Sequence, residues 1–107
     1  MMEIKTIEQD EQVTLRVQGE IEIYSLPDFS RLAESFLGGP RNLTIDVKHM
    51  DYIDSSGLGF LVTLHERLER QGQHLRLVNM NAHVARVFKI TRLDRILDIS
   101  CLEQPVA

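Results

Sequence analysis

The sequence predicts an α/β fold, with a mixed β-sheet that begins in an N-terminal hairpin and with helices packed chiefly on one face. Two strand patterns separated by an acidic turn open the chain, and amphipathic helical patterns then alternate with further strand patterns. No internal repeat, low-complexity tract or linker divides the 107 residues, which is the length of one ordinary domain. We therefore expect residues 1–107 to form a single domain.

The hairpin is expected near the N-terminus. Ile4 and Ile7 indicate a short first strand, and residues 13–17 alternate apolar with polar side chains, as a half-buried strand does. Asp10 and Glu11 supply the turn between these two strands.

The first helix carries signals at both of its ends. Ser25 stands three residues before Asp28, Pro27 is tolerated in a first helical turn, and the apolar residues of 26–37 recur at helical spacing. The Gly-Gly-Pro sequence of residues 38–40 ends the pattern. We expect Ser25 to begin this helix and the glycines to end it.

A motif of small and acidic residues joins the next strand to the longest helix. Residues 43–47 alternate as a strand does, and we expect them to run into a loop over residues 48–54. The segment DSSG, residues 54–57, then opens a helix that Gly72 ends. Leucines recur along one face of this helix and are its expected core contacts: Leu58, Leu61, Leu64 and Leu68.

The C-terminal third is expected to contain two strands and two helices. Residues 75–78 form a strand pattern, and Asn81 is suited to cap a helix that reaches towards Ile90. A further short helix is expected over residues 93–96, and a last strand near residues 99–102.

Charge and hydropathy argue against nucleic acid and membrane as partners. The chain has a formal net charge of −4, and its Lys and Arg residues are dispersed rather than clustered as phosphate binding requires. No apolar run approaches the roughly 18 to 20 residues that span a bilayer, and the N-terminus lacks the pattern of a secretory signal. We therefore expect a soluble, cytoplasmic protein.

The metal-ligating residue types are scattered along the chain. Cys101 is the single cysteine, which excludes an internal disulfide, and no Cys or His stands at zinc-like spacing. We expect the four histidines to be surface or half-buried residues rather than ligands: His49, His65, His74 and His83. The sequence predicts neither a metal nor a cofactor.

The DSSG segment admits a structural and a functional interpretation. A serine at a helix start commonly caps the helix through its hydroxyl, and Gly57 and Gly59 would then allow close packing. The same terminus, with free N–H groups and the positive end of the helix dipole, can also host an added phosphate, and Gly57 leaves the hydroxyl accessible to another protein. Asp54 could orient that hydroxyl or be the cap itself, and spacing does not separate these alternatives.

The motif does not support an intrinsic catalytic function. The G-x-S-x-G elbow of a serine hydrolase needs a glycine two residues before the serine, and neither Ser55 nor Ser56 has one. The GLG sequence is not followed by the lysine of a phosphate-binding loop. Asp51 and Asp54 lack visible further ligands for a metal or a carboxylate pair. We therefore expect no catalytic residue.

Three segments together resemble one known family, the STAS domains. Residues 43–68, LTIDVKHMDYIDSSGLGFLVTLHERL, are similar to the family's third strand and phosphorylation-site helix. Residues 17–29, VQGEIEIYSLPDF, resemble its second strand and acidic loop, and residues 84–99, VARVFKITRLDRILDI, its C-terminal segment. The resemblance spans roughly residues 3–102. Within the family, the chain is similar to the small bacterial anti-sigma factor antagonists.

The resemblance implies a partner-switching protein of bacterial transcription. In these proteins the serine directly after the aspartate, here Ser55, is phosphorylated by an anti-sigma factor that is itself a serine kinase with a histidine-kinase-like ATPase fold, and Ser56 is a neighbour. The unphosphorylated domain binds the anti-sigma factor and frees the sigma factor. Phosphorylation causes release, and a PP2C-type phosphatase resets the domain. ATP belongs to the kinase, so no cofactor is implied for this chain. The residues implied to bind the partner are Glu20, Glu22, Tyr24, Asp54, Ser55, Ser56, Gly57 and Leu58.

Two positions depart from the family pattern, and a second function remains compatible with it. Glu22 stands where the family often carries an aspartate, which keeps the charge but lengthens the side chain. Arg92 replaces a common glycine, so either the turn differs or the arginine incurs a small left-handed penalty. The alternative function is a scaffold or transporter-associated STAS module that binds constitutively without phosphorylation. A DSSG helix start fits both, because the serine can cap the helix in either case.

Overall fold

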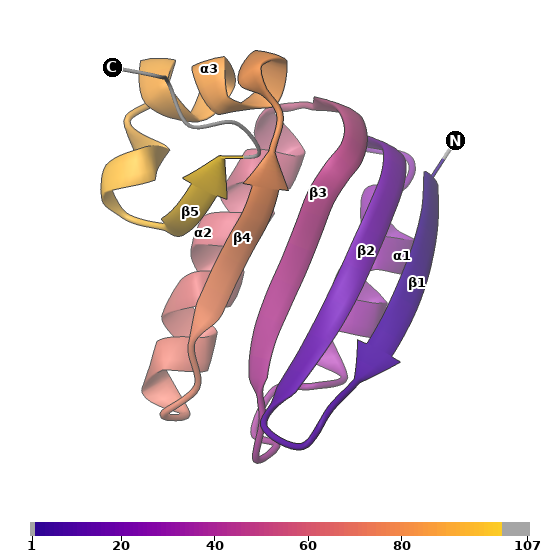
Figure 1. The fold of residues 1–107 in the computed structure, drawn as a ribbon, viewed down its shortest axis with the longest axis vertical. Coiled ribbons are helices and arrows are strands. Elements are labelled where there is room, and N and C mark those ends of the chain that lie inside the picture. Colours follow the sequence, from indigo (N-terminus) through magenta and orange to yellow (C-terminus); the bar gives the residue numbers. More distant parts are fainter. Residues whose placement is uncertain (1, 102–107) are drawn as a thin grey trace.

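A computed structural model of the chain describes residues 2–101. Its elements follow one another in the order β1 (Met2–Glu8), β2 (Gln12–Ile21), α1 (Leu26–Glu34), β3 (Asn42–Ile53), α2 (Ser55–Arg70), β4 (Leu75–Met80), α3 (Ala82–Ile90), the 3₁₀ helix η1 (Leu93–Arg95) and β5 (Asp98–Cys101) (Figure 1). No helix in this part of the chain is long and apolar enough to cross a membrane.

Within residues 2–101, five strands form one sheet in sequence order, β1-β2-β3-β4-β5. β1 and β2 are antiparallel because only a tight turn joins them, whereas the other neighbours are parallel. Parallel neighbours need crossover connections, which the helices supply. Figure 1 shows α1 and α2 behind the same face of the sheet, with α3 across the end at which β4 stops. The predicted mixed sheet with an N-terminal hairpin and helices chiefly on one face is confirmed.

The core lies between the sheet and these helices. Alternate residues of the central strands enter it, as Leu15 and Ile45 do, and Phe29 of α1 packs edge-to-face against Phe60 of α2 with ring centroids 5.7 Å apart. Burial of each large apolar side chain contributes about 1.5–3 kcal/mol. Three of the four leucines predicted on α2 are buried, namely Leu61, Leu64 and Leu68, and Leu58 is half-buried.

The predicted loop over residues 48–54 is wrong, because β3 continues to Ile53. β2 and β3 stay paired as far as Ile21 opposite Ile53, with two register shifts on the way. β3 carries the extra residue at each shift, so the buried residues Met50 and Ile53 stand three positions apart instead of two. These bulges break the period-two pattern by which a strand is recognised in a sequence.

The first helix also departs from expectation at both ends. Ser25 precedes α1, but its side chain makes no capping hydrogen bond, and its hydroxyl donates to Glu20 O at 2.8 Å instead. α1 ends at Glu34, before the predicted glycines, while Phe36 and Leu37 pack against the core from the turns that follow. After Ser35 the backbone hydrogen bonds tighten to i→i−3 spacing, from Phe36 N–H to Ala33 O and from Leu37 N–H to Glu34 O, so turns rather than α-helix lead to the glycines.

The remaining helix ends are largely as predicted. Asn81 Oδ1 accepts a hydrogen bond from Val84 N–H at 2.9 Å, and Gly72 adopts a left-handed φ of +74° just after α2. Arg92 also adopts a left-handed conformation, with φ 63° and ψ 18°, so the arginine takes up the turn that a glycine favours. The last strand is Asp98–Cys101, and residue 102 of the predicted strand lies outside the described residues.

Candidate functional site

The N-terminus of α2 is capped by Asp54. Its backbone is extended, with φ −97° and ψ −178°, and its Oδ1 accepts a hydrogen bond from Gly57 N–H at 3.0 Å. The hydroxyl of Ser56 and the N–H of Gly57 lower the pKa of the Asp54 carboxyl below its ordinary value, so this carboxylate is charged at neutral pH. The interpretation of a serine as the cap is therefore wrong, and the alternative in which Asp54 is the cap is confirmed.

The two serines of the motif differ in their surroundings. Ser56 is half-buried, and its Oγ donates to Asp54 Oδ1 at 2.6 Å. Ser55, the first residue of α2, is exposed, and its hydroxyl makes no hydrogen bond within residues 2–101. One hydroxyl thus serves the cap, and the other is presented to solvent at the helix terminus.

Gly57 allows the start of α2 to approach the sheet. A Cβ at this position would lie 2.8 Å from Ile53 Cγ1 and 2.9 Å from Ile21 Cγ2, both of which are buried. The predicted close packing at Gly57 is thereby confirmed. The same prediction for Gly59 is wrong, because a Cβ there would meet nothing within 4 Å.

The loop between β2 and α1 is fastened to this helix terminus. Asp54 N–H donates to Ile21 O at 3.1 Å, and Asp54 Oδ2 accepts from Ile23 N–H at 3.1 Å. The Glu22 carboxylate accepts from the N–H groups of Tyr24 and Ser25, at 3.2 Å and 2.9 Å. Both acidic side chains therefore organise the backbone of this loop, and Asp54 contacts the loop and α2 at once.

Large apolar side chains are exposed on the two segments that meet at the start of α2. Ile23 is 62% and Tyr24 88% exposed in the loop, and Tyr52, close to the end of β3, is 48% exposed. Tyr52 lies opposite Glu20 in the β2–β3 register, one residue before Ile53 meets Ile21. We name Ile23, Tyr24 and Tyr52 the apolar rim. Sequence reasoning identified Tyr24 but missed the other two, although isoleucine in a loop between acidic residues was an available signal.

The predicted site residues are gathered by the fold at one end of the sheet. Glu20 and Glu22 come from the end of β2 and its loop, and Asp54, Ser55 and Ser56 follow the end of β3. Of the other three, Tyr24 is exposed, Leu58 is half-buried and Gly57 is buried. The ends of two parallel strands and one helix terminus thus bring these residues together, with Ser55 as the accessible serine.

No cluster of three or more His, Cys, Asp or Glu side chains suited to a metal ion occurs among the described residues. The histidine with the most charged neighbours is His74, at the start of β4 and away from the α2 terminus. Its Nε2 lies 2.8 Å from Asp98 Oδ2 and its Nδ1 3.2 Å from Glu69 Oε2. His74 is therefore part of an ion cluster between α2, β4 and β5.

Comparison with known proteins finds relatives that are similar in sequence and in structure. The chain is 35% identical over 99 residues to the anti-sigma-B factor antagonist of Bacillus subtilis, an alignment that covers 92% of this chain and 89% of the relative. A crystal structure of an anti-sigma factor antagonist from Mycobacterium paratuberculosis has a TM-score of 0.83 at 21% identity and covers 92% of this chain and 85% of that one.

The anti-sigma factor antagonist SpoIIAA of Bacillus has the same fold in two states. Its unphosphorylated form matches with a TM-score of 0.74 at 19% identity, covering 94% of this chain and 88% of that one. Its phosphorylated form matches with a TM-score of 0.70 at 18% identity, covering 94% and 91%. The STAS domain family model matches residues 2–103, nearly the whole chain. With this match and the close agreement in fold, the chain belongs to the STAS domain family.

Proposed function

We propose that this protein is an anti-sigma factor antagonist whose binding is switched by phosphorylation of Ser55. In the unphosphorylated state it binds an anti-sigma factor and thereby frees a sigma factor; in the phosphorylated state it is released. The relative from Bacillus subtilis is named an anti-sigma-B factor antagonist, which supports this assignment. Binding, rather than catalysis, is the activity we assign to the chain.

The observation that carries the proposal is the difference between the two serine hydroxyls. A kinase must approach an accessible hydroxyl, and Ser55 offers one at the positive end of the α2 dipole, where a phosphate is stabilised. The Ser56 hydroxyl donates to Asp54 Oδ1 at 2.6 Å, and its phosphorylation would remove this donor from the cap residue. Accessibility and the cap geometry both favour Ser55 as the acceptor.

The apolar rim supplies the contacts that would hold the partner. Tyrosine is enriched among residues that dominate interface energies, and Tyr24 stands out from the loop with 88% of its surface exposed. Glu22 and Asp54 hold the loop backbone in place, which lowers the entropy lost when the rim is buried. We therefore assign Glu22 and Asp54 a positioning role, and Tyr24, Ser55 and Leu58 direct contact. Glu20 and Ser56 complete the proposed surface, and the buried Gly57 lies beneath it.

A phosphate at Ser55 would oppose this binding without unfolding the domain. It adds a charge of about −1.5 to −2 next to Asp54, whose lowered pKa keeps it ionised. An interface that closes over the neutral hydroxyl would have to bury this charge, at a cost of several kcal/mol unless it is paired. Because about 1.4 kcal/mol corresponds to a tenfold change in affinity, release follows.

The proposal extends to the identity of the partners. We infer an anti-sigma factor that is a serine kinase with a histidine-kinase-like ATPase fold, and a PP2C-type phosphatase that restores the free hydroxyl. The ATP is bound by the kinase, and this chain needs no cofactor. We further propose that residues 1–107 act as a single domain in the cytoplasm.

The test begins with the protein that co-purifies with this chain from its own cells. That complex is treated with ATP, the phosphate is mapped by mass spectrometry, and calorimetry compares the affinities of the unmodified and phosphorylated chains for the partner. We expect one phosphate on Ser55 and at least about tenfold weaker binding afterwards. Ser55→Asp should also weaken binding, though less than phosphate because it carries less charge, while Ser55→Ala should bind normally. Equal affinity of the two forms would reject the switch and leave a constitutive STAS scaffold as the function.

A further inference from the structure

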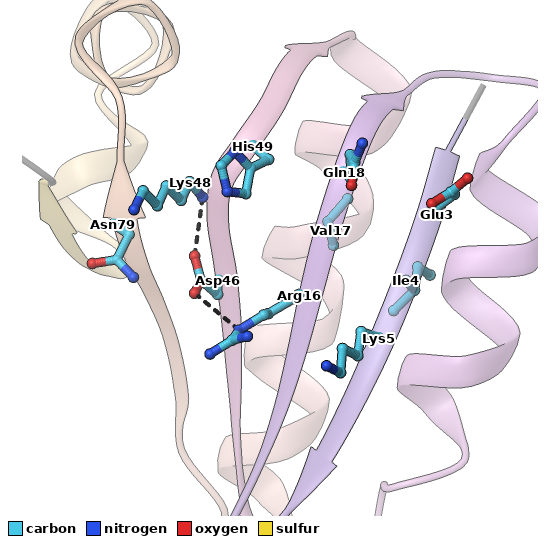
Figure 2. Close-up of a pocket in the computed structure, with 10 residues that line it drawn as sticks. All are labelled: Glu3, Ile4, Lys5, Arg16, Val17, Gln18, Asp46, Lys48, His49 and Asn79. Atoms are coloured by element: carbon cyan, nitrogen blue, oxygen red, sulfur yellow. Dashed lines mark hydrogen bonds and ion pairs between the residues drawn. The ribbon is translucent and has the colours of Figure 1, made fainter.

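A hollow of about 540 Å³ lies on the sheet face opposite α1 and α2 (Figure 2). It is lined from four strands, by Glu3, Ile4, Lys5, Arg16, Val17, Gln18, Asp46, Lys48, His49 and Asn79. Small-molecule sites typically have volumes of roughly 300–1,000 Å³. The hollow is therefore large enough for a small ligand, and it lies outside the surface proposed for the protein partner.

The backbone of β3 and β4 is irregular beside this hollow. β3 carries one extra residue between the pairs Arg16–Asp46 and Gln18–His49, and its pairing with β4 ends at Asp46 opposite Val78. Asn79 follows in a left-handed conformation with φ 59°. Bulges bend strands and redirect side chains, and they are common beside functional sites. Figure 2 shows Lys48 reaching from β3 towards Asn79 across the place where the two strands part.

The lining concentrates positive charge in an acidic protein. Three cationic side chains, Lys5, Arg16 and Lys48, face two carboxylates, whereas the whole chain has a formal net charge of −4. Asp46 is 14% exposed, accepts a hydrogen bond from Lys48 N–H at 3.0 Å and lies 3.7 Å from Arg16 Nε. The Asp46 carboxylate is thus engaged within the sheet, by the Lys48 N–H and by Arg16.

Two of the cations have no acidic partner in the described part of the chain. Among residues 2–101, neither Lys5 nor Lys48 has a carboxylate within ion-pair distance. Lys5 also stands directly opposite Arg16 in the β1–β2 register, and like charges at such positions destabilise a sheet. An anion placed over this pair would turn the repulsion into attraction. The amides of Gln18 and Asn79 add hydrogen-bond donors at the margin.

We propose that this hollow is a binding site for a small molecule that carries two or more anionic groups. Lys5 and Lys48 bind the anionic groups as point charges, and Arg16 contributes its remaining donors while Asp46 holds it in place. The site is a partly open hollow rather than a flat face, which favours a small molecule. The anionic groups could be phosphates or carboxylates, and the experiment separates these two sources.

The test uses inorganic pyrophosphate and citrate as probes on the complete chain. Calorimetric titrations are made at low ionic strength, about 0.05 M, where charge interactions are weakly screened. Backbone amide NMR shifts locate the bound anion. The variant replaces Lys5→Gln and Lys48→Gln together. The matched control replaces Arg86→Gln and Lys89→Gln, two exposed cations of α3 that do not line the hollow, and so removes the same charge.

We expect at least one probe to bind the wild-type chain with shifts at residues 3–5, 16–18 and 46–49. The affinity should fall at least about tenfold in the Lys5/Lys48 variant and stay within about twofold in the control. Preference for pyrophosphate or citrate identifies the anionic group. Equal losses in both variants, shifts confined to Ser55–Leu58, or no binding of either probe would each overturn the proposal. Thermal unfolding confirms that both variants are folded under the conditions of the titrations.

Discussion

Ser56 Oγ donates a 2.6 Å hydrogen bond to Asp54 Oδ1, and this bond distinguishes the two adjacent serines of the DSSG segment. It ties the second hydroxyl into the helix cap and leaves the first, that of Ser55, exposed. The two serines are adjacent in the sequence, yet only the Ser55 hydroxyl is accessible to a kinase.

Ser55→Ala should abolish phosphorylation by the cognate kinase, while Ser56→Ala should still accept one phosphate. Loss of the Ser56 hydroxyl removes one donor to Asp54 but leaves the Gly57 N–H in the cap. Phosphopeptide mapping of both variants after incubation with kinase and ATP checks this prediction. A phosphate on Ser56 of the wild-type chain would contradict the assignment.

Tyr24→Ala should weaken binding to the anti-sigma factor by at least about tenfold, or about 1.4 kcal/mol, because the exposed ring is expected to be an interface anchor. The matched control is Ile96→Ala, which removes an apolar side chain that is 52% exposed beside β5, at the opposite edge of the sheet from β1. Surface plasmon resonance with the immobilised partner measures both variants. Similar affinities for the two would show that the apolar rim is not the contact surface.

Gly57→Ala should destabilise the domain by about 1–3 kcal/mol, because the new Cβ would approach Ile53 Cγ1 to 2.8 Å and force the helix start away from the sheet. Gly59→Ala is the matched control on the same helix. Its Cβ meets no atom within 4 Å, so we expect a gain of about 0.5–1 kcal/mol from helix propensity. Urea denaturation gives both values. An unchanged free energy of unfolding in the Gly57→Ala variant would show that α2 can move away from the sheet at no cost.

Arg92→Gly should stabilise the protein slightly. Arg92 occupies the left-handed region, with φ 63° and ψ 18°, where a side chain costs roughly 1 kcal/mol relative to glycine. The gain should be smaller than this penalty, because glycine also increases the entropy of the unfolded chain. The midpoint of chemical unfolding should rise. A lower midpoint would mean that the arginine makes contacts worth more than the strain.

The ion cluster at His74 should make stability depend on pH. The hydrogen bond to Asp98 is the largest cause that raises the pKa of His74 above its ordinary value, and the bond to Glu69 adds to it. Because the pKa of His74 is higher in the folded than in the unfolded chain, the stabilisation by protonated His74 is fully present below about pH 6.5, the pKa of an unfolded histidine. This stabilisation is lost as the pH rises through the folded-state pKa.

His74→Gln should therefore lower the free energy of unfolding more at about pH 5.5 than at about pH 8.5. The side chain is 45% exposed, so solvent screens the effect and the difference should be modest. Urea titrations of the wild-type and variant proteins at both pH values give the comparison. The same loss of stability at each pH would exclude a contribution from the protonated imidazole.

Patterns along the sequence were sufficient for much of the fold and for the location of the site. The leucine spacing of α2, the Asn81 cap and the left-handed Gly72 depend on residues within one or two helical turns of each other, and such local geometry is readable from the chain. The resemblance at DSSG likewise placed the candidate acceptor at the start of α2. Period-two alternation failed in β3, where two bulges shift the buried positions, and at the end of β4, where the buried residues Leu77 and Met80 stand three positions apart.

The tertiary structure decided how the site residues are used. The hydrogen bond from Ile23 N–H to Asp54 Oδ2 joins residues 31 positions apart, and no local pattern contains it. The pairing of strands likewise brings Lys5 opposite Arg16 on the open face of the sheet. The sequence alone determined most of the elements, because capping and periodicity act between near neighbours, and its resemblance to the STAS domains pointed to Ser55. Only the folded chain determined that Asp54 fastens the β2–α1 loop to the start of α2, because that role depends on a contact between segments that are distant in the sequence.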